Sequence, residues 1–155
     1  MGGPDRGAGQ AQAFLEKAGY RVLRDGFAEV SGIVFAGVDD PVFRRDPDLQ
    51  RERALLESAD QERFIVFMRH RPDVSPTLAG LYDLQLAGHT HGGQIWPASF
   101  ITWNVHKVWQ GETVVEGPAG KSLLYLSNGA GFWGPPMRLF TPPEVLIIDV
   151  VPPKG

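Results

Sequence analysis

The sequence predicts a single domain of the mixed α/β class, with a layered sheet and helices outside it. Strand-like and helix-like segments alternate along the chain, a pattern typical of layered α/β domains. One segment, Phe64–Met68, is almost wholly apolar, as expected for a strand covered on both faces. With 155 residues and 43% hydrophobic content, the chain is long enough to bury one compact core.

The N-terminal part predicts one helix and two strands. Residues 1–9 are rich in glycine and predict a flexible lead-in to the domain. Residues 10–18 carry apolar side chains at helical spacing, so a short helix is expected there. Strands are expected at 20–23 and at 29–38, the second with a turn or bulge at Gly32.

The middle of the chain predicts a second helix over 46–59, with Asp46 as its N-cap and Pro47 in its first turn. This helix has few apolar residues and many charges, which predicts a solvated outer position. After the apolar strand, a short helix is expected over 75–81 and a further strand over 83–87.

The C-terminal third changes character. Residues 96–121 contain many aromatic, glycine and proline residues, which predicts irregular structure. Two buried strands are expected at 123–126 and 145–150, joined by a Gly/Pro-rich loop. The domain is therefore expected to span residues 10–151, with 152–155 as a tail.

Composition limits the possible functions. A net charge of −3 gives no reason to expect nucleic acid as a partner. The chain has no cysteine, so a transition-metal site must be built from histidine, carboxylate and amide groups. No apolar run approaches the roughly 20 residues of a membrane span, and no signal-peptide pattern is present. The expected location is cytoplasmic or membrane-associated, without a choice between them.

The strongest local motif is Leu86-Ala-Gly-His-Thr-His-Gly-Gly-Gln-Ile95. It places His89 and His91 in a loop directly after a predicted strand, and its glycines allow a ligand to approach the backbone closely. Neutral imidazole is a common metal ligand. An isolated His-x-His is a weak signal, however, and a surface turn that happens to contain two histidines explains it equally well.

A third histidine favours the metal hypothesis. His70 also follows an apolar strand, and ligands of α/β sheets gather where strands end. Three unrelated surface histidines remain the alternative, but the shared position at strand ends favours a common site. The residues by themselves therefore predict a transition-metal site formed by His70, His89 and His91.

The motif Gly88–Gln94 also resembles the last metal-binding motif of the calcineurin-like metallophosphoesterases, most closely their bacterial, often membrane-associated branch. Further segments fall in the order that this family shows. They are Gly37–Asp40, Met68–Asp73, Leu124–Gly131, Pro136–Phe140 and Pro143-Glu144.

The resemblance implies a four-layer αββα sandwich with mixed sheets, of which this chain would be the C-terminal half. It also implies a metal-dependent phosphoester hydrolase with two divalent ions (Mn, Zn or Fe) that activate a hydroxide. His70 and His89 would bind the second ion, and His91 the first. The substrate would be a small phosphoester or a nucleotide–lipid conjugate. A missing N-terminal region would provide any membrane association.

The chain also departs from the family. The motifs Asp-x-His, Gly-Asp-x-x-Asp and Gly-Asn-His-Asp/Glu are absent, and with them the bridging aspartate and most first-site ligands. Two classes of function follow. The chain is either part of a phosphoesterase, weakly active or inactive by itself, or a non-catalytic metal-binding fragment that needs a separately supplied N-terminal half.

Other residues have two interpretations each. Arg138 is a weaker candidate for substrate binding, since guanidinium matches phosphate geometry, but a salt bridge explains it equally well. Arg69 faces either phosphate or solvent. His106 is expected to be a packing or surface residue, and Asp39 and Asp40 turn residues. The tryptophan-rich C-terminal third is expected to form ordinary packing, with a substrate- or lipid-facing patch as the alternative.

Overall fold

The computed structural model describes residues 4–40 and 47–151 of the chain. Its elements in chain order are α1 (Pro4–Lys17), β1 (Gly26–Val30), β2 (Ile33–Gly37), α2 (Leu49–Glu57), β3 (Phe64–Met68), the 3-10 helix η1 (Pro76–Leu78), β4 (Leu84–Ala87), the 3-10 helix η2 (His91–Gly93), α3 (Ala98–His106), β5 (Gly111–Gly117) and β6 (Gly120–Leu126).

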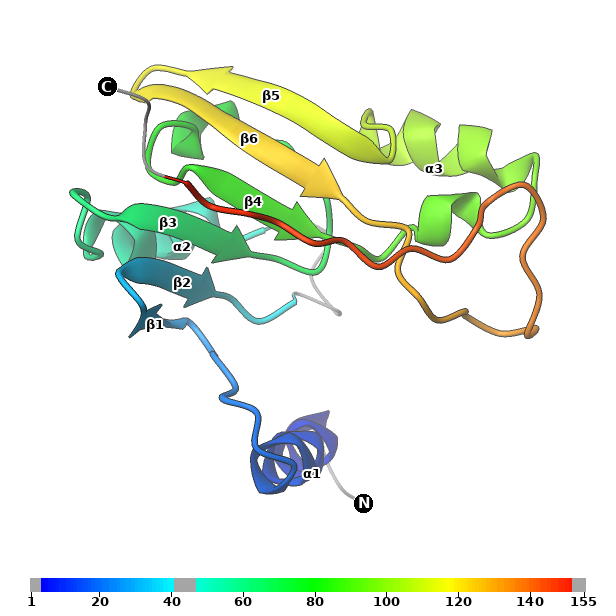
Figure 1. Cartoon of the computed structure of the whole chain (residues 1–155), viewed down its shortest axis with the longest axis horizontal. Helices are drawn as coiled ribbons and strands as arrows, with labels where there is room; N and C mark the ends of the chain where they lie inside the picture. Colours follow the sequence, from blue (N-terminus) through cyan, green and yellow to red (C-terminus); the bar gives the residue numbers. More distant parts are fainter. Residues whose placement is uncertain (1–3, 41–46, 152–155) are drawn as a thin grey trace.

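The strands form one mixed sheet in the order β1-β2-β3-β4-β6-β5 (Figure 1). The four inner strands run parallel, whereas the edge strands β1 and β5 pair antiparallel with their neighbours. The predicted mixed α/β class is therefore confirmed. Parallel neighbours also bring the loops after β2, β3, β4 and β6 to one edge of the sheet.

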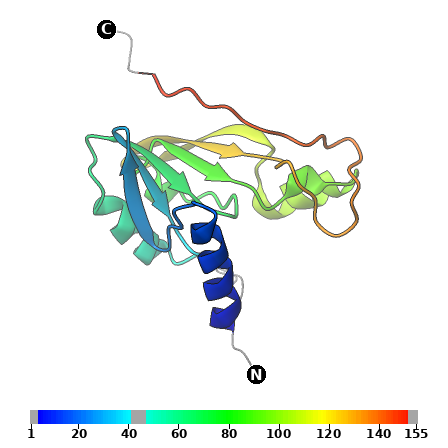
Figure 2. The ribbon, with the colours of Figure 1, turned by 60° about the horizontal axis from the view of Figure 1, so that its bottom comes forward.

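The two faces of the sheet are covered differently. α2 lies against one face, and its Leu56 packs with Ala36, Ile65 and Phe67 in the main core. Residues 141–151 cross the opposite face, and α1 projects away from the sheet (Figures 1 and 2). On that opposite face, side chains of β2, β3 and β4 stay half-exposed, namely Ile33, Phe35, Phe64, Met68 and Leu86.

Helical boundaries differ from the prediction at two points. α1 begins at Pro4 rather than at residue 10, because proline suits the first turn of a helix, so most of the expected lead-in is helical. Asp46 lies outside the described residues. Asp48 is the N-cap of α2, and its side chain accepts a hydrogen bond from the backbone N–H of Arg51 at 3.1 Å. The expected tail at 152–155 also lies outside the described residues.

The N-terminal strands were predicted incorrectly. Residues 20–23 form no strand, and 29–38 is not one strand but the second part of a hairpin made by β1 and β2. Ser31 and Gly32 both have positive φ (52° and 81°), as the tight turn of a hairpin requires. The turn expected at Gly32 is therefore confirmed, but it separates two strands where one was predicted.

Residues 96–121 are more regular than predicted. Pro97 lies just before α3, where it starts the helix rather than breaking it. β5 was missed because its exposed edge position tolerates polar residues such as Glu112 and Glu116. Its pairing with β6 extends the strand expected at 123–126 back to Gly120.

The strand expected at 145–150 does not form. This segment has no secondary structure and is exposed, with Val145 and Ile147 at 83% and 85% exposure. Its apolar residues fit a strand, but it pairs with neither edge strand of the sheet, β1 or β5. Among the shorter elements, β3 was predicted with its observed bounds, β4 to within one residue, and the helix of 75–81 shortens to η1.

Candidate metal and phosphoester site

The candidate site lies at the edge of the sheet where the four parallel strands end. Asp40 follows β2, His70 follows β3, His89 follows β4 and Asn128 follows β6. These side chains are distant in sequence, and the parallel order of the strands brings them together. Asp40 was expected to be a turn residue, but it lines the same cavity as the histidines and forms an ion pair with Arg71 at 3.0 Å.

His70 and His89 are in direct contact. Nδ1 of His89 lies 3.0 Å from Nε2 of His70, and their ring centroids are 4.8 Å apart at 72°. The backbone holds the two loops together, because the N–H of Gly88 donates to the carbonyl of His70 at 3.1 Å. Imidazole nitrogens bind zinc at about 2.0–2.1 Å, so two that share one ion lie about 3 Å apart. The observed spacing fits a shared ion.

His91 lies in the same cavity but has another close partner. Its Nδ1 is 3.3 Å from a guanidinium nitrogen of Arg138, whose other amino group donates to the His91 carbonyl at 3.3 Å. Within residues 4–40 and 47–151, no three His, Asp or Glu side chains gather closely enough to hold one ion. The assignment of all three histidines as metal ligands therefore stays a prediction.

The histidine loop favours neutral imidazoles. Burial lowers the pKa of His89 below its usual value, and nearby His70, His106 and Arg71 lower it further. Burial and the neighbouring Arg138 also lower the pKa of His91. Neutral imidazole, the form that binds metal, is therefore the main form of both side chains at pH 7.

His106 packs within the protein, one of the two roles expected for it, but its partner His89 was not predicted. His106 ends α3, and its ring packs edge-on against His89 with centroids 5.8 Å apart. Its Nδ1 lies 3.8 Å from Asp73. No sequence signal pointed to this contact, because it depends on how α3 packs against the loop after β4.

Arg69 and Arg138 are both engaged within the protein. Arg69 is buried and forms an ion pair with the buried carboxylate of Glu52 on α2 at 3.1 Å, so it faces neither phosphate nor solvent. Arg138 donates to a group of backbone carbonyls, those of His91, Asn128, Gly129, Gly131 and Thr141. It ties the loop after β6 to the histidine loop, and its role in substrate binding stays a prediction.

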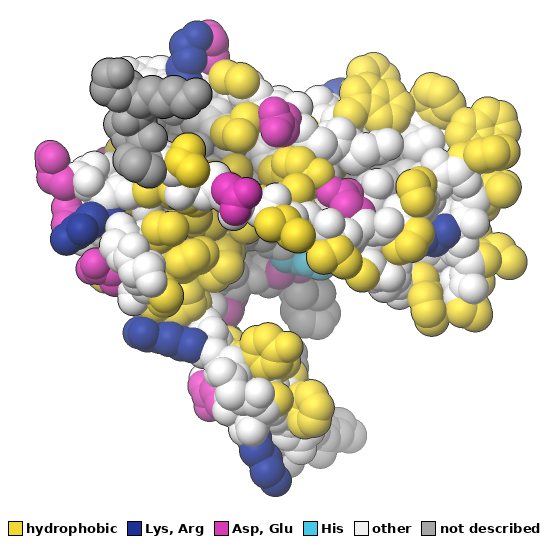
Figure 3. Space-filling model, viewed as in Figure 1, with side chains coloured by type: hydrophobic (Ala, Val, Ile, Leu, Met, Phe, Trp, Pro, Cys, Tyr) yellow, Lys and Arg dark blue, Asp and Glu magenta, His cyan; other side chains and the backbone are white. Residues whose placement is uncertain are grey.

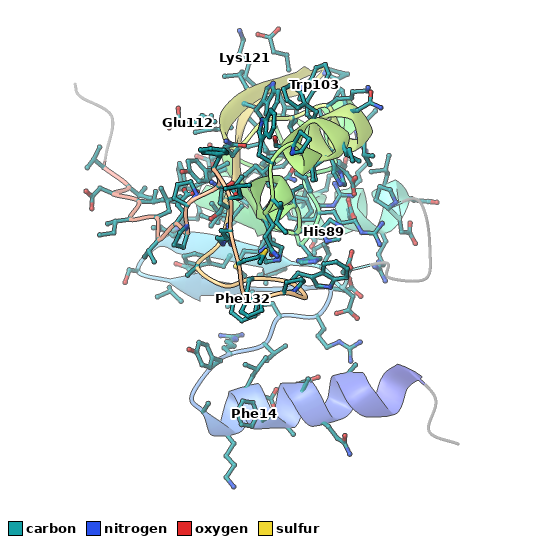
Figure 4. All side chains as sticks on the ribbon, turned by 90° about the vertical axis from the view of Figure 1, so that its right-hand side faces the viewer. Phe14, His89, Trp103, Glu112, Lys121 and Phe132 are labelled. Carbon is teal, nitrogen blue, oxygen red and sulfur yellow. The ribbon has the colours of Figure 1, made fainter. Side chains whose placement is uncertain are left out.

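A cavity of about 740 Å³ opens beside the histidines. Its lining includes His70, His89, His91 and Asp40 together with the apolar residues Ile95, Ala98, Trp133 and Pro135. Gln94 ties the histidine loop to the loop after β6, since its side-chain amide both donates to and accepts from the backbone of Trp133, at 2.7 and 2.6 Å. Viewed from this end, His89 lies between Trp103 and Phe132 (Figure 4).

Close packing in the loop requires glycine. A Cβ on Gly93, whose φ is +80°, would lie 2.2 Å from the backbone nitrogen of Ser99 in α3. Glycine therefore lets α3 approach the histidine loop and form one side of the cavity.

Comparison with known proteins finds several metallophosphoesterases that resemble the chain over most of its length. The chain is 32% identical to an uncharacterized metallophosphoesterase of Aquifex aeolicus over 148 residues, which are 93% of this chain and 56% of that protein. It is 37% identical to the uncharacterized metallophosphoesterase Cj0846 of Campylobacter jejuni over 129 residues, 81% of this chain and 32% of that protein. It is 29% identical to the uncharacterized metallophosphoesterase YkuE of Bacillus subtilis over 150 residues, 90% and 49% of the two chains.

The chain spans between about a third and just over half of the length of these three relatives. No family model and no solved structure matches it. Among the described residues, no helix is long and apolar enough to cross a lipid bilayer. On these sequence similarities, which extend over most of its residues, the chain belongs to the metallophosphoesterase family.

Proposed function

We propose that this chain provides the C-terminal half of a metal-dependent phosphoester hydrolase. The observation that carries the proposal is the contact between His70 and His89, 3.0 Å apart, at the carboxyl ends of adjacent parallel strands. The chain is similar in sequence to metallophosphoesterases over about 90% of its length, which supports the same conclusion. The half-exposed apolar face of the sheet supports the proposal that an N-terminal half exists, because a second sheet in that half would cover this face.

The residues present fit part of a dinuclear centre. His70 and His89 would hold one divalent ion (Mn, Zn or Fe), and His91 would contribute to a second. Bound divalent ions supply a hydroxide near neutral pH and positive charge beside the phosphate oxygens. The remaining ligands, including a bridging carboxylate, would come from the N-terminal half.

This chain's own residues would orient the reacting groups. The ring of His106 packs on His89 and limits its rotation, and Arg138 holds the loop of His91 through the backbone. The low pKa of His89 and His91 keeps both imidazoles neutral at pH 7. The apolar part of the cavity lining excludes water and would accept the organic part of the ester. The apolar lining therefore supports the proposal that the substrate is a small phosphoester with an apolar group, such as a nucleotide–lipid conjugate.

Hydrolysis of bis-p-nitrophenyl phosphate tests this function. Residues 1–155 alone should show little turnover with manganese or zinc, because three imidazoles do not complete two metal sites. A longer protein that contains an upstream Asp-x-His … Gly-Asn-His region should be active, and His89→Ala or His91→Ala should remove most of that activity. Metal-dependent hydrolysis by residues 1–155 that is lost in His89→Ala would contradict the half-domain proposal.

The alternative is a non-catalytic metal-binding chain whose N-terminal half is a separate protein. The two proposals differ in the coding sequence before Met1. An in-frame upstream half supports the enzyme, whereas its absence, with zinc binding retained, supports the binding fragment.

A further inference from the structure

One end of the molecule exposes many large hydrophobic side chains. We call this surface the aromatic rim and define it by Phe100, Ile101 and Val105 of α3 and by Phe132, Trp133 and Phe140 of the loop after β6. The exposure of these six side chains ranges from 55% for Phe100 to 80% for Phe140. α3 has no buried residue at all, so packing within this chain does not explain its hydrophobic sequence. An exposed apolar patch of this kind marks an interaction surface.

The rim borders the cavity on two sides. Ala98 and Thr102 of α3 line the cavity from one side, and Trp133 and Pro135 of the loop line it from the other. In the space-filling view, hydrophobic side chains crowd the right-hand end, where α3 and this loop lie (Figure 3). The same end faces the viewer in Figure 4, with Trp103 and Phe132 on either side of His89.

Charge is unevenly distributed relative to the rim. None of the chain's 18 Asp and Glu residues falls within 84–111 or 117–143, the segments that contain the rim. These segments do carry Lys107 and Arg138, and Nζ of Lys107 lies 5.5 Å from the centroid of the Trp103 ring. All four tryptophans of the chain also lie here, between Trp96 and Trp133. Tryptophan and lysine together are typical of surfaces that contact the interface of a bilayer.

We propose that the aromatic rim binds the surface of a lipid bilayer that contains anionic phospholipids. The rim supplies aromatic and aliphatic side chains for the headgroup region, and the exposed Lys107 at the end of α3 complements a negative membrane surface. A second copy of the chain fits less well, because a symmetric contact through the rim would bring two Lys107 side chains together with no acidic partner. Binding would turn the mouth of the cavity toward the lipid. A lipid-linked phosphoester could then reach the cavity from the membrane. Only this consequence rests on the proposed function.

Vesicle binding tests the proposal with the whole chain and no metal. The protein should sediment with vesicles that contain equal amounts of phosphatidylcholine and phosphatidylglycerol. Trp133 belongs to the rim, and Trp96 and Trp109 pack against its Phe140 and Phe100, so vesicles with brominated acyl chains should quench the intrinsic fluorescence. The double variant Ile101→Ser/Phe132→Ser should lower the partition coefficient about tenfold or more, because two side chains that enter the interface are lost.

Matched variants separate the rim from other surfaces. Phe14→Ser removes a more exposed phenyl group (72% exposed) from α1, far from the rim, and should leave binding unchanged. Lys107→Gln should weaken binding to the anionic vesicles about fivefold and leave binding to pure phosphatidylcholine unchanged. Lys121→Gln, which removes a lysine from the far end of β6, should change neither.

Three results would overturn the proposal. The first is no sedimentation with the anionic vesicles. The second is sedimentation without quenching by brominated lipid, which would place the membrane contact elsewhere. The third is a dimer that the double variant dissociates and that vesicles do not compete with, which would assign the rim to a second copy. None of these results depends on metal binding or hydrolysis, so they test the rim separately from the proposed phosphoesterase.

Discussion

Nδ1 of His89 and Nε2 of His70 lie 3.0 Å apart, although the two residues are 19 positions apart in the chain. The contact exists because β3 and β4 are parallel neighbours, with Met68 opposite Leu86 in the register. Each histidine is the second residue after its strand, so the register of the two strands sets the distance between the rings. A metal ion bound by both would depend on this register.

Removing either of these histidines should weaken zinc binding. We expect His70→Ala and His89→Ala each to lower the affinity about tenfold or more, since both nitrogens serve one ion. Isothermal titration calorimetry at neutral pH measures the effect. His106→Ala is the matched control, because it removes an imidazole that touches His89 without ligating. An equal loss in His106→Ala would contradict the assignment of the ligands.

The buried pair of Glu52 and Arg69 should make stability depend on pH. Burial raises the pKa of Glu52 above its usual value of 4.5, against the opposing charges of Arg69 and Arg51. Between 4.5 and the raised value, the folded protein holds a proton that the unfolded chain releases, so the free energy of unfolding falls as pH rises.

Urea denaturation from pH 4 upward should reveal this effect by comparison with Glu52→Gln, which does not titrate. The stability of the wild-type chain relative to this variant should be highest below 4.5, the usual pKa of a glutamate, and should decline through the raised pKa. A difference that is constant with pH would show that Glu52 ionises equally in both states. Comparing the two proteins removes the contribution of the histidines, which titrate in both.

Gly93→Ala should destabilise the protein by about 2–4 kcal/mol, because the new Cβ would collide with the backbone of α3. Thermal unfolding measures this cost. Gly129→Ala is the control, since Gly129 also has positive φ (+69°) but has no atom within 4 Å of the Cβ position. It should show only the backbone cost, about 1 kcal/mol. Equal losses in the two variants would mean that contact with α3 is unimportant.

Arg138→Lys should destabilise the protein, although it keeps the positive charge. The planar guanidinium reaches several carbonyls at once, which an ammonium group does not do. We expect a loss of about 1–3 kcal/mol in the free energy of unfolding and a shift in tryptophan emission from the attached loop. Arg63→Lys, at an exposed ion pair with Asp60, is the control and should be neutral. If Arg138→Lys were as stable as the wild-type protein, the result would instead favour a role for Arg138 in binding the substrate through its positive charge.

Local patterns in the sequence were sufficient for several features. The apolar run Phe64–Met68 predicted β3 with its observed bounds, because a strand buried on both faces needs apolar residues throughout. The run before Gly88 predicted β4 to within one residue, and thus the loop that carries His89 and His91. Gly88–Gln94 also indicated the family that sequence comparison then showed.

Other features depend on contacts between distant segments, which local patterns do not contain. The turn at Gly32 was predicted from the sequence, whereas the pairing of β2 with the distant strand β3 was not. Residues 145–150 have the composition of a strand but lie outside the sheet, because a strand forms only where a partner offers hydrogen bonds.

The sequence by itself predicted the candidate residues His70, His89 and His91 and the strand ends at which they lie. The tertiary structure alone decided their partners. Arg69 is paired with Glu52 because α2 covers that face of the sheet, and His106 meets His89 because Gly93 lets α3 pack closely. The physical reason is that burial, and with it ion pairing and pKa, depends on which elements meet in space, whereas hydrophobic periodicity reports only the local conformation of each segment.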